Sequence, residues 1–205
     1  MENNTIDRLK KCFKARNIDF HYFEDKAELI LSIVEAAKKA DSIGIGNSQT
    51  LKKLRIFETV SEYCQHVYDK TLAGSKEEEV KLKRQALLTD LYITSSNAIT
   101  ADGRIINVDH SGNRVAAMTF GPRQVIIIIG ENKLTENEQE GILRSLKVAT
   151  PLNARRAKYS PPCTQNRPCA ECLQNQRVCN YLSIIRGQVH PQRMSVMMLK
   201  GNYGY

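Results

Sequence analysis

The stretch DLYITSSNAITADGRIINVDHSGNRVAAMTFGPRQVIIIIG, Asp90 to Gly130, contains the pattern that decides the fold. Two short apolar runs, Leu91 to Thr94 and Val125 to Ile129, lack the polar alternation of a half-exposed strand. Such runs are typical of parallel strands that are buried on both faces. Between them, Ala101-Asp102-Gly103 supplies the turn chemistry of a small hairpin that joins Ile99 to Ile105.

Helical and strand-like patterns alternate on both sides of this stretch. Apolar spacing predicts helices near residues 6–13, 25–39, 75–88 and 134–146, and strands near 18–23, 42–45, 63–68 and 193–199. Strands interleaved with helices indicate an α/β fold with a mostly parallel sheet. We expect residues 1–150 to form one α/β domain, and residues 151–205 to form a basic, cysteine-rich segment whose closing strand packs back on that domain.

Length and composition are those of an ordinary globular protein. The chain has 205 residues, of which 41% are hydrophobic and 25% are charged. Its first residues lack the apolar core of a signal peptide, and no run approaches the ~20 apolar residues that a membrane span requires. The sequence therefore predicts a cytoplasmic protein without a membrane span.

The positive charge lies mainly in the last part of the chain. The net charge is +8, and residues 151–205 contain eight Lys and Arg against Glu171 alone. Four clustered cysteines, if deprotonated, would offset part of this charge. Trp is absent and aromatic residues make up 6% of the chain, so platforms for base stacking are scarce. We therefore do not expect a nucleic-acid partner.

Those four cysteines form the pattern Cys163-x₅-Cys169-x₂-Cys172-x₆-Cys179. In a reducing compartment, thiolates at such short spacing indicate a metal site rather than disulfides. Both Zn²⁺ and an iron–sulfur cluster fit the four thiolates, and the spacing does not decide between them. No NAD or FAD fingerprint is visible, because the Gly44-Ile45-Gly46 turn lacks the third glycine of that motif.

Two groups of polar residues are candidates for binding a ligand. The turn that contains Gly44, Gly46, Ser48 and Thr50 precedes a helix start and suits an anion, although it also fits a plain tight turn with a helix cap. The second group follows the central strands, where α/β sheets bind ligands, and Arg114 is suited to clamp a carboxylate. Its members are Ser96, Asn97, Asp102, Asp109, Asn113 and Arg114. Alternatively, some of them only satisfy turns.

Several segments together resemble the lactate-utilization (LUD) domain family. These are GIGNSQTL, SNAITADG, DHSGNRVAA, FGP before VIIIIGENK, and the cysteine-bearing tail. The resemblance implies a three-layer α/β/α sandwich similar to the ribose-phosphate isomerase, glucosamine-phosphate deaminase and CoA-transferase group. It also implies that the two polar groups face each other across one cleft.

The same resemblance implies a function. Relatives are implicated in oxidising L-lactate to pyruvate beside iron–sulfur partner proteins, so we expect a small anionic metabolite and iron–sulfur redox partners. No motif assigns a catalytic residue. Two alternatives stay open: an isomerase or transferase acting on a sugar phosphate or acyl-CoA, and a metal-stabilised nucleic-acid-binding module.

Overall fold

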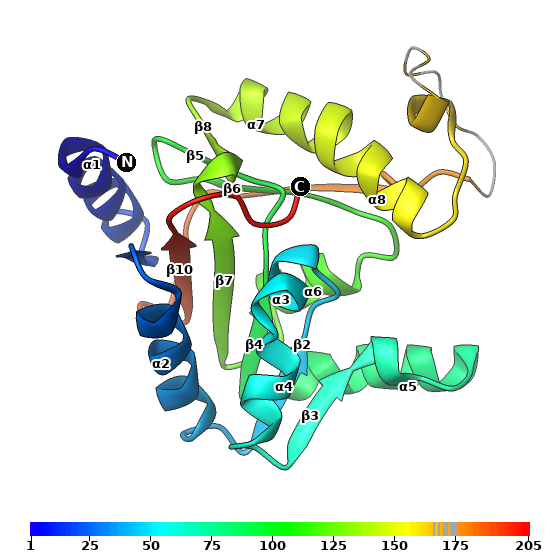
Figure 1. The fold of residues 1–205 in the computed structure, drawn as a ribbon, viewed down its shortest axis with the longest axis horizontal. Coiled ribbons are helices and arrows are strands. Elements are labelled where there is room, and N and C mark those ends of the chain that lie inside the picture. Colours follow the sequence, from blue (N-terminus) through cyan, green and yellow to red (C-terminus); the bar gives the residue numbers. More distant parts are fainter. Residues whose placement is uncertain (166, 168, 170–171, 173–175) are drawn as a thin grey trace.

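Six parallel strands form the central sheet of the protein (Figure 1). The structure is a computed structural model that describes residues 1–165, 167, 169, 172 and 176–205. Every neighbouring pair in this sheet is parallel. In spatial order the strands are β1 (Asp19–Phe23), β10 (Met194–Leu199), β7 (Gln124–Gly130), β4 (Leu91–Thr94), β2 (Ser42–Ile45) and β3 (His66–Asp69). The predicted α/β class and the mostly parallel sheet are therefore confirmed.

A second, smaller sheet is built on the predicted hairpin. Its strands, in order, are β8 (Leu134–Thr135), β5 (Ala98–Thr100), β6 (Ile105–Asp109) and β9 (Tyr181–Ile185). β5 and β6 are antiparallel, with Ile99 opposite Ile105. Gly103 in the turn has φ +88°, a conformation that a glycine adopts without steric cost. The sequence predicted this turn, but not the flanking strands that complete the sheet.

Helices connect the strands, and several of them begin after a residue whose side chain caps the first turn. The α-helices are α1 (Asn3–Lys14), α2 (Lys26–Ala37), α3 (Gln49–Leu54), α4 (Ile56–Ser61), α5 (Lys76–Gln85), α6 (Asn113–Thr119), α7 (Glu138–Arg144) and α8 (Thr150–Arg156). Asp25 caps α2 and Ser75 caps α5, each by accepting a hydrogen bond from a backbone N–H in the first turn. A π-helical turn, Ser145–Ala149, joins α7 to α8. Short 3₁₀ turns are η1 (Lys70–Leu72), η2 (Ala86–Leu88), η3 (Glu131–Lys133) and η5 (Pro162–Gln165).

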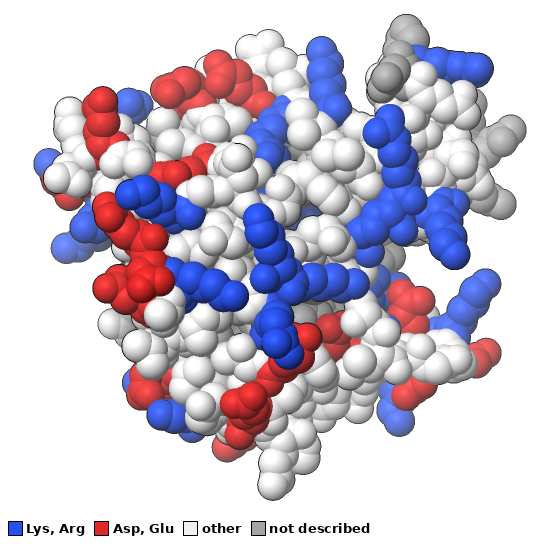
Figure 2. Space-filling model, in the orientation of Figure 1, with Lys and Arg blue, Asp and Glu red and all other residues white. Residues whose placement is uncertain are grey.

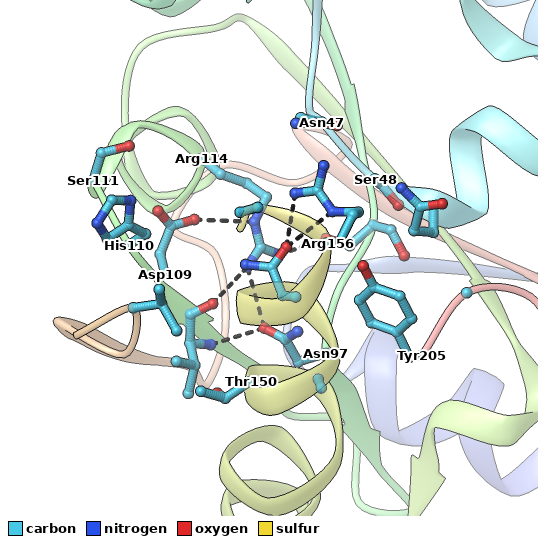
Figure 3. Close-up of a pocket in the computed structure, with 18 of the residues that line it drawn as sticks. Asn47, Ser48, Asn97, Asp109, His110, Ser111, Arg114, Thr150, Arg156 and Tyr205 are labelled. Atoms are coloured by element: carbon cyan, nitrogen blue, oxygen red, sulfur yellow. Dashed lines mark hydrogen bonds and ion pairs between the residues drawn. The ribbon is translucent and has the colours of Figure 1, made fainter. Parts of the chain in front are cut away.

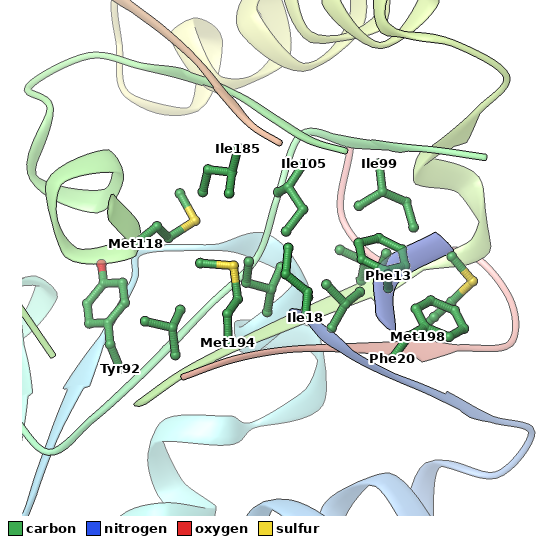
Figure 4. Packing of buried hydrophobic residues seen from close by; sticks show 14 of the residues in the cluster. Phe13, Ile18, Phe20, Tyr92, Ile99, Ile105, Met118, Ile185, Met194 and Met198 are labelled. Atoms are coloured by element: carbon green, nitrogen blue, oxygen red, sulfur yellow. The ribbon is translucent and has the colours of Figure 1, made fainter. Parts of the chain in front are cut away.

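The two faces of the central sheet are covered differently. Ile126 and Ile128 of β7 pack into a core cluster with residues of α2, α3 and α4. Ile127 and Ile129 point to the opposite face, where the cluster contains residues of α1, α6 and the smaller sheet (Figure 4). That second face is thus covered by helices and strands together. The predicted α/β/α layering is therefore confirmed only as an α/β arrangement around a mostly parallel sheet.

The C-terminal part of the chain contributes strands to both sheets. The predicted closing strand corresponds to β10, which lies between β1 and β7 in the central sheet. β9 pairs with β6 in the smaller sheet. The predicted division of the chain at residue 150 is not tested by these contacts and stays a prediction. Across the described ranges, no helix is both long and apolar enough to cross a membrane.

Glycine at position 46 is required by the close approach of β4. A Cβ placed there would lie 2.4 Å from Thr94 Oγ1 and 2.9 Å from Thr94 Cβ. We expect Gly46→Ala to lower the free energy of unfolding by roughly 1–3 kcal/mol, because the buried strands must separate. Gly74→Ala is the matched control, since its Cβ would meet only Glu78 Oε2 at 3.5 Å. Urea unfolding of both variants tests this, and equal stabilities would contradict it.

Candidate functional site

A cavity of about 420 Å³ opens at the carboxyl edge of the central sheet (Figure 3). Residues that follow four of the parallel strands line it: Asn47 and Ser48 after β2, Lys70 after β3, Ser95 after β4, and Lys133 after β7. Parallel strands end at the same edge of a sheet, so these side chains converge although they are distant in sequence. Helix α8 and the chain end at Tyr205 complete the wall.

The structure brings most of the sequence-predicted ligand residues to this cavity. Both predicted groups contribute to its lining, with Ser48 and Thr50 from the first and Ser96, Asn97, Asp109, Asn113 and Arg114 from the second. The two groups therefore share one cleft. Their role in binding a ligand stays a prediction.

Three predicted residues, Gly44, Gly46 and Asp102, are not among the residues that line the cavity. A Cβ at Gly44 would lie 2.8 Å from the Tyr92 ring, so close strand packing accounts for this glycine, as it does for Gly46. Asp102 lies in the β5–β6 turn, where it forms ion pairs with Arg16 at 3.4 Å and Arg104 at 3.2 Å. Its contacts hold the turn against the N-terminal helix.

Lys133 is the most unusual residue of the cavity, and the sequence reasoning missed it. Its side chain is 3% exposed, and its Nζ donates hydrogen bonds to Ser95 Oγ at 2.9 Å, Thr50 Oγ1 at 3.0 Å and the Ser96 carbonyl at 3.0 Å. No ion pair of Lys133 is found within the described part of the chain. The ammonium group is therefore buried among neutral acceptors.

This environment changes the protonation of the lysine. Burial lowers the pKa of Lys133 to about 7, and the positive charges of Arg144 and Arg114 contribute to the same shift. A buried cation is costly without a partner of opposite charge, and a lysine escapes that cost by losing its proton. At neutral pH, Lys133 is thus divided between the ammonium form and the neutral amine.

Arg114, the predicted carboxylate clamp, is held by the protein itself. Its Nε forms an ion pair with Asp109 at 3.1 Å, its Nη1 donates to Asn107 and the Ser95 carbonyl, and its Nη2 donates to Asn97 and the Val108 carbonyl. Each guanidinium nitrogen is therefore already engaged. These contacts give Arg114 a positioning role, because they fix the loops after β4 and β6 around the cavity.

The charges around the cavity are predominantly positive. Among the described residues, its lining contains five Lys and Arg side chains and two acidic side chains, Glu79 and Asp109. Glu79 is shared by Lys83 at 2.8 Å and Lys70 at 3.4 Å. Arg156 lies at the wall beside Tyr205 (Figure 3) and donates to Asn153 Oδ1 at 2.8 Å. Figure 2 shows Lys and Arg side chains crowding the same face near α3 and α8.

Lys133 and Arg156, which the sequence did not predict as site residues, stand in sequence contexts that only weakly indicate a site. Lys133 stands three residues after the buried VIIIIG strand, and a lysine so close to the carboxyl end of a central strand is a signal that could have found it. Arg156 stands in a basic run of the C-terminal segment, where its neighbours Arg155 and Lys158 are equally charged. Nothing in that run distinguishes the arginine that reaches the cavity.

The four predicted metal ligands, Cys163, Cys169, Cys172 and Cys179, lie in the C-terminal part of the chain, where Val178 lines the cavity. Burial raises the pKa of the Cys163 thiol, and the nearby thiols of Cys172, Cys179 and Cys169 raise it further. Within residues 1–165, 167, 169, 172 and 176–205, no three His, Cys, Asp or Glu side chains form a group that could hold a metal ion. The predicted metal at these cysteines therefore stays a prediction.

Comparison with known proteins identifies the family of this chain. The family model of the LUD domain matches residues 6–199. Among solved structures, the chain is similar to a DUF162 family protein from Deinococcus radiodurans, with 18% sequence identity, a TM-score of 0.53 and 97% of each chain covered. At this identity the likeness concerns the fold alone. No curated protein matches the chain.

The lowered pKa of Lys133 predicts a pH-dependent stability. Folding lowers this pKa below its unfolded value near 10, so the unfolded chain binds more protons between pH ~7 and ~10. The contribution of Lys133 to stability therefore rises with pH across that window. Lys133→Met abolishes this titration, so the stability of the wild type relative to the variant should increase by up to ~1.4 kcal/mol per pH unit.

Urea unfolding at pH 7, 8 and 9 measures this difference. Lys147→Met is the matched control, because Lys147 is exposed and lies away from the cavity lining. Its stability relative to the wild type should stay constant over the same range. A wild-type advantage over Lys133→Met that does not change with pH would contradict the prediction.

Proposed function

Since the chain belongs to the LUD-domain family, we propose that its cavity binds a small anionic metabolite, lactate or a related hydroxy acid. In this proposal the protein is one component of a system that oxidises the hydroxy acid. Oxidation requires an electron acceptor, and a separate iron–sulfur protein would supply it. The wider role rests on family membership, whereas the anion site rests on the residues of the cavity.

The observation that carries the proposal is the uncompensated charge of Lys133. Its Nζ is buried at the cavity, and its hydrogen-bond partners within the described part of the chain are hydroxyl and carbonyl oxygens. A bound anion would supply the missing negative charge and would raise the pKa of the lysine toward its ordinary value. Ligand binding would thus recover free energy that the empty cavity loses by burying a cation.

Two other features favour a hydroxy acid over a simple anion. Asn47 lines the cavity, and its Oδ1 is buried with no hydrogen-bond partner among the described residues. A ligand hydroxyl would satisfy this acceptor. Arg156 provides a guanidinium at the exposed wall, suited to pair with a carboxylate. A cavity of about 420 Å³ has room for a metabolite of this size.

The same cations would also attract a phosphate, so a sugar phosphate remains the alternative ligand. The nucleic-acid alternative has less support, because cations of the tail are engaged within the protein. Arg186 pairs with Glu138 at 3.3 Å, and Arg193 donates to the Met118 carbonyl at 2.9 Å. Retention of DNA or RNA that weakens steeply with salt would favour that alternative.

Neighbouring arginines allow a matched test of the anion site. Lactate and pyruvate should raise the melting temperature of the wild type, because a ligand that binds only the folded state stabilises it. Arg156→Gln should weaken this binding roughly tenfold, as expected for loss of a charge-assisted contact. Arg155→Gln should not, since Arg155 lies outside the cavity lining and donates to the Thr164 carbonyl.

Thermal shift titrations with lactate, pyruvate, glucose 6-phosphate and ribose 5-phosphate provide the measurement. Stabilisation by the phosphate esters but not by the carboxylates would favour the isomerase or transferase alternative. Equal effects of the two arginine substitutions would argue against this cavity as the site.

The cysteine segment supports a second proposal, that it binds zinc or an iron–sulfur cluster. The support is that Cys163 lies close enough to Cys169, Cys172 and Cys179 for their charges to affect its pKa. Such thiolates would hold the metal and order the segment that begins after the cavity residue Tyr159. Their chemistry does not decide between the two species.

Anaerobically purified protein should contain a stoichiometric metal. We expect either zinc, or iron with sulfide and a broad visible absorption, and Cys179→Ser should lower the metal content because it removes one of four ligands. Cys64→Ser is the control, since Cys64 is buried in the core beside β3. Wild-type protein without metal after anaerobic purification would refute the proposal.

A further inference from the structure

We propose that Lys133 is a nucleophile whose amine forms an imine with the ketone of a 2-oxo acid bound in the cavity. This inference rests on the proposed anion site and adds a class of ligand to it. Oxidation of a 2-hydroxy acid gives a 2-oxo acid, so both compounds would bind in the same site. The hydroxy acid has no carbonyl and would bind there without a covalent bond.

The geometry supplies a buried amine that pairs with no carboxylate of the residues that the structure describes. Lys133 follows the central strand β7 and lies 3% exposed at the cavity, where the side chain has little freedom to move into solvent. The positive charges of Arg144 and Arg114 lie near enough to disfavour protonation of its Nζ. Desolvation and neighbouring cations are the two conditions that activate a lysine as a nucleophile, because only the neutral amine has a free electron pair.

Hydroxyl groups beside Nζ can carry the protons that imine formation releases and consumes. Ser95 Oγ and Thr50 Oγ1 lie 2.9 and 3.0 Å from Nζ and 3.3 Å from each other. The Thr50 hydroxyl also donates to the Tyr203 carbonyl at 3.0 Å. A hydroxyl both donates and accepts, so this pair can pass a proton between the amine and the ketone oxygen.

The chemical step balances without an oxidant or a reductant. The Nζ electron pair forms a bond to the ketone carbon, and the carbonyl π electrons move to oxygen. That oxygen gains a proton while nitrogen loses one through the hydroxyl pair, giving a carbinolamine. The nitrogen electron pair then expels the hydroxyl, which leaves as water by taking a proton from the hydroxyl pair. Nitrogen returns its second proton to that pair as the carbon–nitrogen double bond forms. The products are one imine and one water.

The positive charge of the cavity favours a carbonyl compound that also has a carboxylate. Besides Lys133, four Lys and Arg side chains and two Asp or Glu side chains line it among the described residues. A simple aldehyde would lack that attraction, whereas a 2-oxo acid has its carboxylate next to the reacting carbon. The site should therefore prefer pyruvate and similar acids to neutral carbonyl compounds.

Reductive trapping tests the inference directly. The full-length protein is incubated at pH 7.5 with pyruvate and sodium cyanoborohydride, and then analysed by intact mass and peptide mapping. We expect one adduct on Lys133, heavier by the mass of pyruvate less one oxygen atom. In the empty cavity, a pKa of about 7 leaves most of Lys133 as the neutral amine at this pH. A bound carboxylate raises that pKa in part, so labelling should exceed that of a typical exposed lysine by at least ~10-fold.

Substitutions provide the controls. Lys133→Arg keeps a positive charge but has no nucleophilic amine, so it should lose the adduct. Lys147→Arg, at an exposed position outside the cavity, should keep it. Lactate should protect Lys133 in the wild type by occupying the same site. Peptide mapping of the wild-type adduct shows whether Lys133 is the labelled residue, even if Lys133→Arg does not fold.

The outcomes separate this inference from the function it rests on. If pyruvate raises the melting temperature but no adduct forms on Lys133, the nucleophile is refuted while the anion site stands. If neither carboxylate shifts the melting temperature and no adduct forms, the anion site itself fails. Labelling spread evenly over exposed lysines would also overturn the inference.

Discussion

The burial of β7 on both faces is the constraint on which the rest of the structure depends. Its residues Val125 to Gly130 are all buried, and it pairs in parallel with β10 on one side and β4 on the other. Such a strand leaves no backbone hydrogen bond for water and no face without a core. The strands beside it run in the same direction, which collects their carboxyl ends at one edge.

That edge explains why the cavity is both polar and charged. The loops after β2, β4 and β7 begin at the same edge of the sheet, so their hydroxyl, amide and ammonium groups line one cavity. Lys133 is 3% exposed, and its burial is the main cause of its lowered pKa. Arg114 is bound to five protein acceptors and positions the loops around the cavity, whereas the described hydrogen-bond partners of Lys133 are neutral oxygens. Lys133, rather than Arg114, is thus the residue whose positive charge lacks a negative partner among the described residues.

Gly44, Gly46 and Asp102 show that residues predicted to bind a ligand can instead be required by contacts within the fold. Gly44 and Gly46 permit β2 to approach Tyr92 and Thr94, and the ligand-facing part of the same segment is Asn47 to Thr50. Asp102 was one of the predicted site residues, but its carboxylate pairs with Arg16 and Arg104. In each case, neighbours distant in sequence determine what the residue does.

The sequence by itself determined the α/β class, the parallel central strands, the β5–β6 turn and most of the loops that line the cavity. These follow from local properties, namely apolar runs, turn chemistry and the rule that parallel strands end at one edge. Only the tertiary structure placed β9 in the smaller sheet, set β10 beside β7 and selected Arg156 from a basic run. It also made Lys133 the central residue, because desolvation and the fields of Arg144 and Arg114 depend on distances through space that no sequence spacing encodes.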